Sequence, residues 1–310
     1  MFVGVATQDA IALVDAYPRA NDRVLAQMIR HAGGGPAATA AVACSRLGIP
    51  AAFVGAIARD ALGDAILEGL RGEGVAIDAV LRVPGESGGS LVTVDRVNET
   101  RAICNRPGPA LHIPMDSDAA SLIRSADWVH VDQLGWAAVT ALLADLPPEA
   151  GPKLSVDGGN HIPDFTPAGV ALYAPTIERL QHLYGDGDPL ALMQRARDAG
   201  AACVVATAGA SGSYALDTME HWAVPAYRAD ITSTLGAGDV FHGALLAAFA
   251  HGFPTGEALA YANIAAALSC RGLDGRSTIP SDGETRALLS RLTPVRAPLT
   301  RMTTTKDPSQ

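Results

Sequence analysis

The sequence has few of the features that mark a disulfide-stapled, zinc-binding or nucleic-acid-binding protein. Its cysteines are widely separated (Cys44, Cys104, Cys203 and Cys270), with no C-x-x-C pair and no histidine cluster at metal-ligand spacing. We therefore expect reduced, mostly buried thiols in a cytosolic protein. Lys and Arg number 23 against 32 Asp and Glu, a formal net charge of −9. This shortage of positive charge argues against nucleic acid as a partner, so any anionic ligand must be held locally.

Long apolar runs and the common glycine-rich nucleotide loops are also missing. No apolar segment reaches the roughly 20 residues that a membrane span requires, and the N-terminus lacks a basic region followed by a cleavage signal. We expect a cytoplasmic protein without membrane association. The pattern G-x-x-x-x-G-K-[ST] does not occur, which excludes a P-loop enzyme, and the G-x-G at residues 236–238 does not fit the dinucleotide fingerprint.

Short apolar runs alternate with helical patterns along most of the 310 residues. Runs of strand length occur at residues 2–6, 51–57, 127–131, 153–157 and 203–207, and helical patterns at 37–47, 62–70, 137–143, 190–199, 241–249 and 257–268. Buried strands that alternate with helices are typical of a mainly parallel sheet covered on both faces. The pattern predicts a doubly wound α/β fold, and 48% hydrophobic residues suffice to fill its core.

Two segments interrupt this alternation. Residues 11–28 and 88–106 have the pattern of antiparallel strands, the second pair turning at Asn98 and Glu99. Antiparallel strands cannot join a parallel core without a crossover, so we expect a small separate sheet that acts as a lid over an active site. Residues 1–295 are predicted to form one domain with this lid, and residues 296–310 a disordered tail.

The segment TSTLGAGDVFHGALL, residues 232–246, places small residues and a carboxylate at the start of an apolar helix. Backbone N–H groups at a helix N-terminus attract anions, and glycine lets a ligand approach them closely. We interpret Gly236, Ala237 and Gly238 as an anion hole and Asp239 as the base that takes a proton from an attacking alcohol. Ordinary helix capping explains the same spacing about equally well.

Four motifs lie in order along nearly the whole chain. They are GVATQDAIALVDAYP near the N-terminus, GGGPAATAAVACSRLG at residues 33–48, VVATAGASG, and TLGAGDVFHGALL. Together they resemble the motifs of the ribokinase, or phosphofructokinase B (PfkB), family of sugar kinases. The resemblance implies a ribokinase-like three-layer α/β/α core with a mainly parallel sheet and a small β-sheet lid, an ATP-dependent kinase, and Asp239 as its base. It also implies substrate contacts from Asp9, Gly33, Gly34, Gly35 and Thr39, and nucleotide contacts from Thr207, Gly209, Gly212 and Asn263.

The chain departs from the family pattern where cations are concerned. The last motif usually begins with Asp at the position of Ser233, which argues against dependence on a monovalent cation. A family Asn-x-x-Glu motif that orders magnesium through water would fall at Thr176 and Arg179, so Glu178 becomes the candidate metal ligand. Magnesium is still expected, because the charge on the phosphates of ATP must be neutralised. Thr39 also stands where the family has Asn.

The resemblance narrows the substrate only to a class. We expect a furanose-form sugar, with a ketohexose or a 6-substituted fructose such as sulfofructose favoured. A nucleoside kinase and a non-catalytic sugar sensor of the same fold are the alternatives. Asn105 and Arg106 of the lid are candidate substrate ligands, since an arginine can grip a distal phosphate or sulfonate, although lid arginines are more often solvated. Exposed lid strands also favour a homodimer.

Two further side chains allow either a functional or a structural interpretation. His242 follows Asp239 by one helical turn, so it either poises the base or, more commonly for such a residue, packs against the sheet. Asp157 ends a predicted strand at the edge where ligands of open α/β sheets bind, and a phosphate-proximal role competes there with ordinary turn formation.

Overall fold

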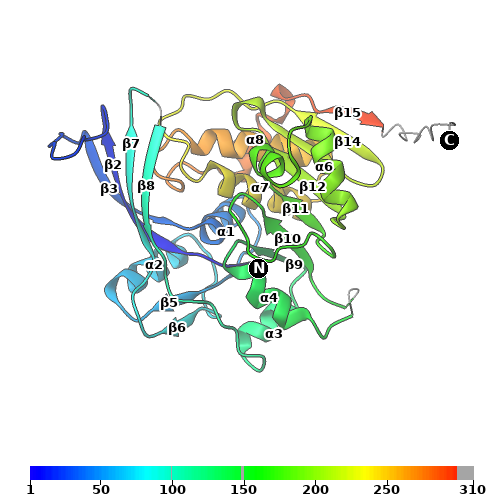
Figure 1. The fold of residues 1–310 in the computed structure, drawn as a ribbon, viewed down its shortest axis with the longest axis horizontal. Coiled ribbons are helices and arrows are strands. Elements are labelled where there is room, and N and C mark those ends of the chain that lie inside the picture. Colours follow the sequence, from blue (N-terminus) through cyan, green and yellow to red (C-terminus); the bar gives the residue numbers. More distant parts are fainter. Residues whose placement is uncertain (99, 148–149, 299–310) are drawn as a thin grey trace, which may run out of the picture.

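A nine-stranded sheet in the order β15-β14-β13-β12-β11-β10-β9-β1-β4 forms the centre of the protein (Figure 1). The computed structural model describes residues 1–98, 100–147 and 150–298. The parallel part of the sheet comprises β4 (Phe53–Val54), β1 (Phe2–Val3), β9 (Trp128–Val131), β10 (Lys153–Asp157), β11 (Leu172–Ala174) and β12 (Cys203–Thr207). Three antiparallel strands extend it: β13 (Ser213–Leu216), β14 (Glu220–Val224) and β15 (Val295–Pro298). The mainly parallel sheet is as predicted.

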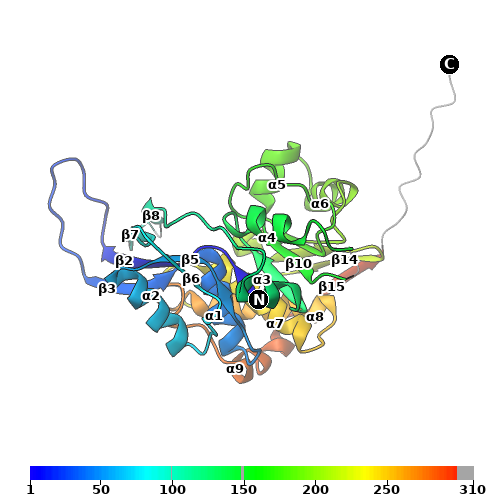
Figure 2. The ribbon, with the colours of Figure 1, turned by 90° about the horizontal axis from the view of Figure 1, so that it is seen from below.

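Helices cover both faces of this sheet, as the edge-on view in Figure 2 shows. One face carries α1 (Pro36–Arg46), α2 (Ala61–Gly72), α7 (Ala237–Ala250), α8 (Thr255–Ser269) and α9 (Asp282–Arg286). The other carries α3 (Asp118–Arg124), α4 (Gly135–Leu143), α5 (Ile177–Tyr184) and α6 (Pro189–Asp198). Side chains alternate between the faces of a strand, so Phe2 joins one hydrophobic cluster and Val3 the other. The two clusters make the three-layer core.

A separate four-stranded sheet in the order β3-β2-β7-β8 stands beside the core. It consists of β3 (Met28–Gly34), β2 (Thr7–Val14), β7 (Gly89–Asp95) and β8 (Thr100–Arg106). The outer pairs are antiparallel as predicted, but β2 and β7 pair in parallel. The first two strands lie at residues 7–14 and 28–34, so most of the 11–28 segment connects them instead. Residues 96–98 form the turn after β7, and Glu99 lies outside the described residues.

Several short elements differ from the prediction. The run at 51–57 divides at Gly55 into β4 and β5 (Ala56–Ala58), and β5 pairs with β6 (Leu81–Val83) in a two-stranded sheet. Residues 296–298 of the expected tail belong to β15, while 299–310 lie outside the described residues. The sequence did not predict helices α3, α5 and α9, the one-turn helices η1 (Gly209–Ser211) and η2 (Leu289–Arg291), or strands β6, β11, β13 and β14. Most of these elements have three to five residues, which are too few to show a periodicity. Within the described ranges, no helix combines the length and hydropathy needed to cross a bilayer.

Candidate active site

The start of helix α7 presents a set of free backbone donors. Gly236, the residue before the helix, has φ 74°, and a Cβ there would lie 2.8 Å from the Cα of Gly275. Only glycine fits this left-handed conformation against a neighbouring backbone. Ala237 N–H donates to the carbonyl of Thr234 (3.3 Å), whereas the N–H groups of Gly236, Gly238 and Asp239 donate to no acceptor in the described part of the chain. The predicted anion hole thus has free donors, although Ala237 does not supply one.

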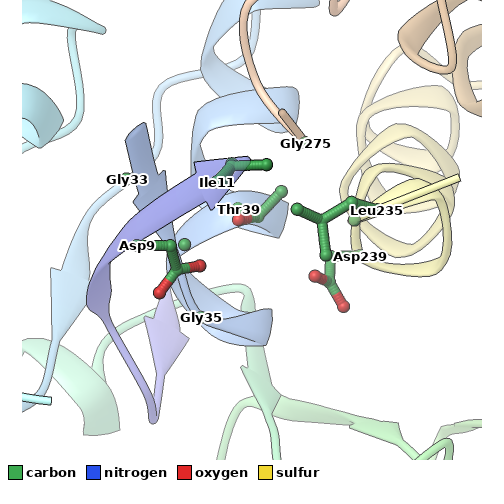
Figure 3. Close-up of a pocket in the computed structure, with 10 residues that line it drawn as sticks. Asp9, Ile11, Gly33, Gly35, Thr39, Leu235, Asp239 and Gly275 are labelled. Atoms are coloured by element: carbon green, nitrogen blue, oxygen red, sulfur yellow. The ribbon is translucent and has the colours of Figure 1, made fainter. Parts of the chain in front are cut away.

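A pocket lies between this helix start and the small sheet (Figure 3). Its lining includes Asp9, Ile11, Gly33, Gly34, Gly35, Thr39, Leu235, Gly236, Asp239 and Gly275. Asp9 enters from β2 and Asp239 from α7, with Thr39 of α1 between them. The fold therefore brings together the substrate-side residues predicted from the first two motifs and the predicted base, although these lie far apart in the sequence.

Two glycines of β3 make room for charged side chains beside the pocket. Asp9 is 7% exposed, and its Oδ1 accepts a hydrogen bond from the N–H of Ser90 (3.0 Å). A Cβ on Gly34 would lie 2.1 Å from the Oδ2 of Asp9, and one on Gly33 would lie 2.3 Å from the Nη1 of Arg276. These glycines allow a carboxylate and a guanidinium to pack against the strand.

Arg276 is a site residue that the sequence reasoning did not identify. It is buried, its Nε donates to the Oγ1 of Thr39 (3.1 Å), and its Nη2 donates to the carbonyl of Gly34 (2.7 Å). Burial lowers its pKa to about 10, and nearby carboxylates, Asp9 first among them, oppose that decrease. The guanidinium therefore stays charged and fixes α1 and β3 relative to each other. A lone arginine in a loop carries no spacing signal that would have revealed this role.

The small sheet is fastened to the core by arginines on its pocket side. Arg101 Nη1 donates to the Oγ1 of Thr234 (2.8 Å), and Arg30 forms an ion pair with Asp274 (3.2 Å). Thr234 lies in the loop before α7, and Asp274 precedes Gly275 and Arg276. The sheet thus covers the pocket as the predicted lid would.

Of the two lid residues predicted to bind substrate, only Asn105 lies on the pocket side. Ser90 pairs with Asp9 on one side and with Asn105 on the other, so the three side chains lie on the same face of the small sheet. Asn105 Nδ2 donates a hydrogen bond to the Oγ of Ser90 (3.2 Å). Arg106 is the next residue along β8, and because successive side chains of a strand alternate between its faces, Arg106 faces the opposite side. It is paired with Glu86 (2.9 Å) and donates to the carbonyl of Ser87 (2.8 Å). The structure does not bring Arg106 to the pocket.

Buried charge around Asp239 shifts the pKa of its carboxyl group toward neutral pH. Burial raises its pKa to about 7, and the negative charge of Asp157 adds to the increase. Asp132, which accepts hydrogen bonds from backbone N–H groups of Val5 (2.7 Å), Leu134 (2.9 Å) and others, adds further repulsion. His242 and Arg276 act in the opposite direction. A base with this pKa matches the pH at which proton transfer from an alcohol is most useful.

The predicted nucleotide-side residues gather at the end of β12. Thr207 ends that strand, η1 follows, and Gly212 (φ 102°) closes the turn against the carbonyl of Val224. Asn263 of α8 donates through Nδ2 to the carbonyls of Val224 (3.1 Å) and Pro225 (3.1 Å). Its amide donors therefore hold the loop next to Gly212, which gives Asn263 a positioning role beside the predicted nucleotide loop.

Glu178, the predicted metal ligand, lies close to this loop. It is exposed on the first turn of α5, and Thr176, which caps that helix by accepting from Arg179 N–H (3.0 Å), pairs with Thr207. An exposed carboxylate at this edge of the sheet is the type of oxygen donor that Mg²⁺ takes directly or through water. Ser233, where the family pattern has Asp, accepts a hydrogen bond from Leu235 N–H (3.2 Å) and supplies no charge for a cation.

A carboxylate beside free helix N-terminal donors, at an edge of a doubly wound sheet, is an arrangement suited to the transfer of a phosphoryl group to a hydroxyl. The chain belongs to the pfkB family of carbohydrate kinases, whose family model matches residues 1–282. It is 25% identical over 298 residues to the ribokinase of Bacillus subtilis (strain 168), covering 93% of this chain and 98% of that protein. It is 27% identical over 291 residues to the ATP-dependent ribose-1-phosphate kinase of Halopiger xanaduensis, covering 91% and 95%.

A solved structure shows the same fold. The ribokinase of Arabidopsis thaliana, complexed with ribose and ATP, superposes with a TM-score of 0.80 at 24% identity, covering 93% of this chain and 97% of that one. The ribokinase-like fold predicted from the motifs is confirmed. With the family membership, the comparisons also confirm the predicted ATP-dependent sugar kinase.

Proposed function

We propose that the protein transfers the γ-phosphoryl group of ATP to a hydroxyl of a furanose-form sugar bound between Asp9 and Asp239. The observation that carries this proposal is the meeting of Asp239, free N–H donors at the start of α7, and Asp9 in one pocket. Asp239 accepts the proton of the attacking hydroxyl, and the N–H groups stabilise charge on the transferring oxygens. The small sheet excludes water that would otherwise hydrolyse ATP.

The pocket favours a neutral sugar over one with a distal anionic group. Its lining carries two carboxylates and, among the described residues, no basic side chain. Arg106 is held on the opposite face of the lid, and Arg276 uses two of its nitrogens within the protein. Of the arginines on the pocket side of the lid, Arg30 is paired with Asp274 and Arg101 is bonded to Thr234. Carboxylates accept hydrogen bonds from sugar hydroxyls but repel a phosphate or sulfonate. An unsubstituted ketohexose or pentose therefore suits the site better than sulfofructose.

We propose that Mg²⁺ accompanies ATP and that Glu178 holds it through water. The ion would neutralise the phosphate charge, while Thr207, Gly209 and Gly212 provide the loop against which the nucleotide lies. Support comes from the exposed side chain of Glu178, which lies two residues after Thr176, the residue that pairs with Thr207. Because Ser233 is neutral and its oxygen is used in a turn, we expect activity without potassium.

We also propose a homodimer formed through the outer face of the lid sheet. On the face of the sheet opposite Asp9, Leu91 is 59% exposed and Ile29 is 69% exposed. Their neighbours on the adjoining strands are Ala10, Ala12 and the exposed Cys104. This face is apolar and belongs to a sheet, so a second copy of the same face is a matching partner.

The proposed chemistry is tested by Asp239→Asn, which keeps the shape of the side chain and removes the base. We expect kcat to fall by about a thousandfold or more with ATP binding retained, since both a general base and its charge are lost. Asp186→Asn, at an exposed site, is the control. Near-native turnover by Asp239→Asn would contradict the assignment.

The substrate is tested by following ATP consumption with fructose, ribose, sulfofructose, sugar phosphates and adenosine, each with and without potassium. We expect the highest kcat/KM for a neutral furanose-form sugar. A preference for adenosine would identify a nucleoside kinase, and a preference for sulfofructose or a sugar phosphate would contradict the charge argument.

A further inference from the structure

A buried histidine one helical turn after the proposed base is paired with a buried aspartate. His242 follows Asp239 by one turn of α7 and is 6% exposed, and its Nδ1 lies 3.3 Å from the Oδ2 of Asp157 at the end of β10. The other carboxylate oxygen of Asp157 accepts a hydrogen bond from Gly159 N–H (2.8 Å). The ring of His130, on β9, is centred 5.5 Å from that of His242. Neither hydrophobic packing nor the catalytic step described above requires a charged pair here.

The charge state of the pair follows from its surroundings. The ionisable groups that act on His242 are Asp157 on β10, His130 on β9 and Asp239 on the same helix. Asp132 after β9 and Arg276 in the loop after α8 act on Asp239, and Tyr173 on β11 interacts with Asp157. Burial opposes the charge of His242, but Asp157 and then Asp239 outweigh it and raise the pKa. Burial and the charge of His242 lower the pKa of His130 to about 3. These shifts favour an imidazolium at His242 paired with the carboxylate of Asp157, beside a neutral His130.

We propose that His242 is a positioning residue which, held as a cation by Asp157, sets the pH at which Asp239 becomes a base. Its positive charge offsets the negative charge that Asp157 and Asp132 place next to Asp239. Without it, Asp239 would face two buried carboxylates and hold its proton to higher pH. The proposal depends on the role of Asp239 given under Proposed function.

The single variant of His242 and the double variant of His242 and Asp157 should have different pH profiles. His242→Gln leaves the charge of Asp157 uncompensated, so the acid limb of kcat/KM against pH should move upward by about one unit or more. With the wild-type limb near pH 7, this corresponds to about a fivefold or greater loss at pH 7, with recovery at high pH. In the double variant Asp157→Asn/His242→Gln the repulsion is also gone, so the limb should return toward its wild-type position.

These kinetics separate an electrostatic role from a structural one. Loss of packing would lower kcat/KM equally at all pH values, and the double variant would be no better than His242→Gln. Either that pattern or an unmoved limb in His242→Gln would overturn the proposal. Phe249→Leu, in a partly buried position at the far end of the same helix, controls for general weakening of α7.

A direct measurement keeps this test independent of phosphoryl transfer. In ¹⁵N-labelled protein, the ring nitrogens of His242 should report an imidazolium at pH 7 and above, and a neutral ring in Asp157→Asn. If that result is obtained while Asp239→Asn stays active, the charge pair stands and the proposed function fails. A neutral His242 in the wild type would overturn the proposal. So would a stoichiometric metal ion in the purified protein, because the ligand atoms of His130, Asp157 and His242 lie within 4.8 Å of one another.

Discussion

The proposed base, Asp239, should act near neutral pH because its surroundings disfavour its charge. Burial raises its pKa to about 7, so the carboxylate is protonated below that pH and cannot accept a proton from the sugar. We expect kcat/KM to fall about tenfold for each pH unit below 7 and to level off above it, since this quantity reports the free enzyme. Steady-state kinetics with saturating ATP from pH 5 to pH 9 measure the profile. A limb at the ordinary aspartate value near 4 would contradict the described environment.

The glycine at position 33 tests how tightly Arg276 is held beside the pocket. In Gly33→Ala the new Cβ would lie 2.3 Å from Nη1 of a guanidinium that two hydrogen bonds hold in place. We expect a free energy of unfolding lower by about 1–3 kcal/mol, together with a raised KM for the sugar. The matched control is Gly69→Ala in α2, where a Cβ meets no atom within 4 Å and a gain of up to about 1 kcal/mol is expected. Equal behaviour of the two variants in urea unfolding would refute the role of Gly33.

At the scale of elements, the site depends on the close approach of α1 and α7. Thr39 lies on α1 and Asp239 on α7, and Gly243 of α7 faces the carbonyl of Ala40 so closely that a Cβ would lie 2.2 Å from it. Small residues along α1 allow this contact. The two helices therefore set the width of the pocket between them.

We predict that Gly243→Ala separates these helices and weakens both stability and catalysis. The free energy of unfolding should fall by about 1–3 kcal/mol, and kcat should fall because Asp239 moves relative to the sugar. Gly72→Ala, near the end of α2 with no atom within 4 Å of the added Cβ, is the control and should change neither quantity markedly. Unchanged kcat in a destabilised Gly243→Ala would show that the pocket does not depend on this contact.

At the scale of the whole molecule, the outer face of the lid predicts association. Leu91→Glu would place a charge in the centre of that face, and two such charges would meet in a symmetric pair. We expect light scattering after size exclusion to give a dimer for the wild type and a monomer for Leu91→Glu. Met219→Glu, which alters an exposed residue at the turn between β13 and β14, should leave the dimer intact. A monomeric wild type would contradict the proposal.

Much of the fold could be predicted because its longer elements carry a strong pattern. The apolar runs at residues 127–131, 153–157 and 203–207 became β9, β10 and β12, and the six helical patterns became α1, α2, α4, α6, α7 and α8. Burial on one or both faces imposes this periodicity. The 51–57 run divided at Gly55, and short elements such as β11 were missed, because so few residues do not reveal which sheet they join.

The sequence alone determined the family and predicted the chemistry of the helix start. Glycine residues next to a carboxylate at the start of an apolar helix form a local motif, and a local motif can be recognised from consecutive residues. Only the tertiary structure decided that Arg106 faces away from the pocket, because strand register sets which side a residue occupies. It also decided that Arg276 supports Thr39 and that His242 meets Asp157, because both contacts join segments far apart in the chain. Such contacts arise from packing, which no stretch of neighbouring residues encodes.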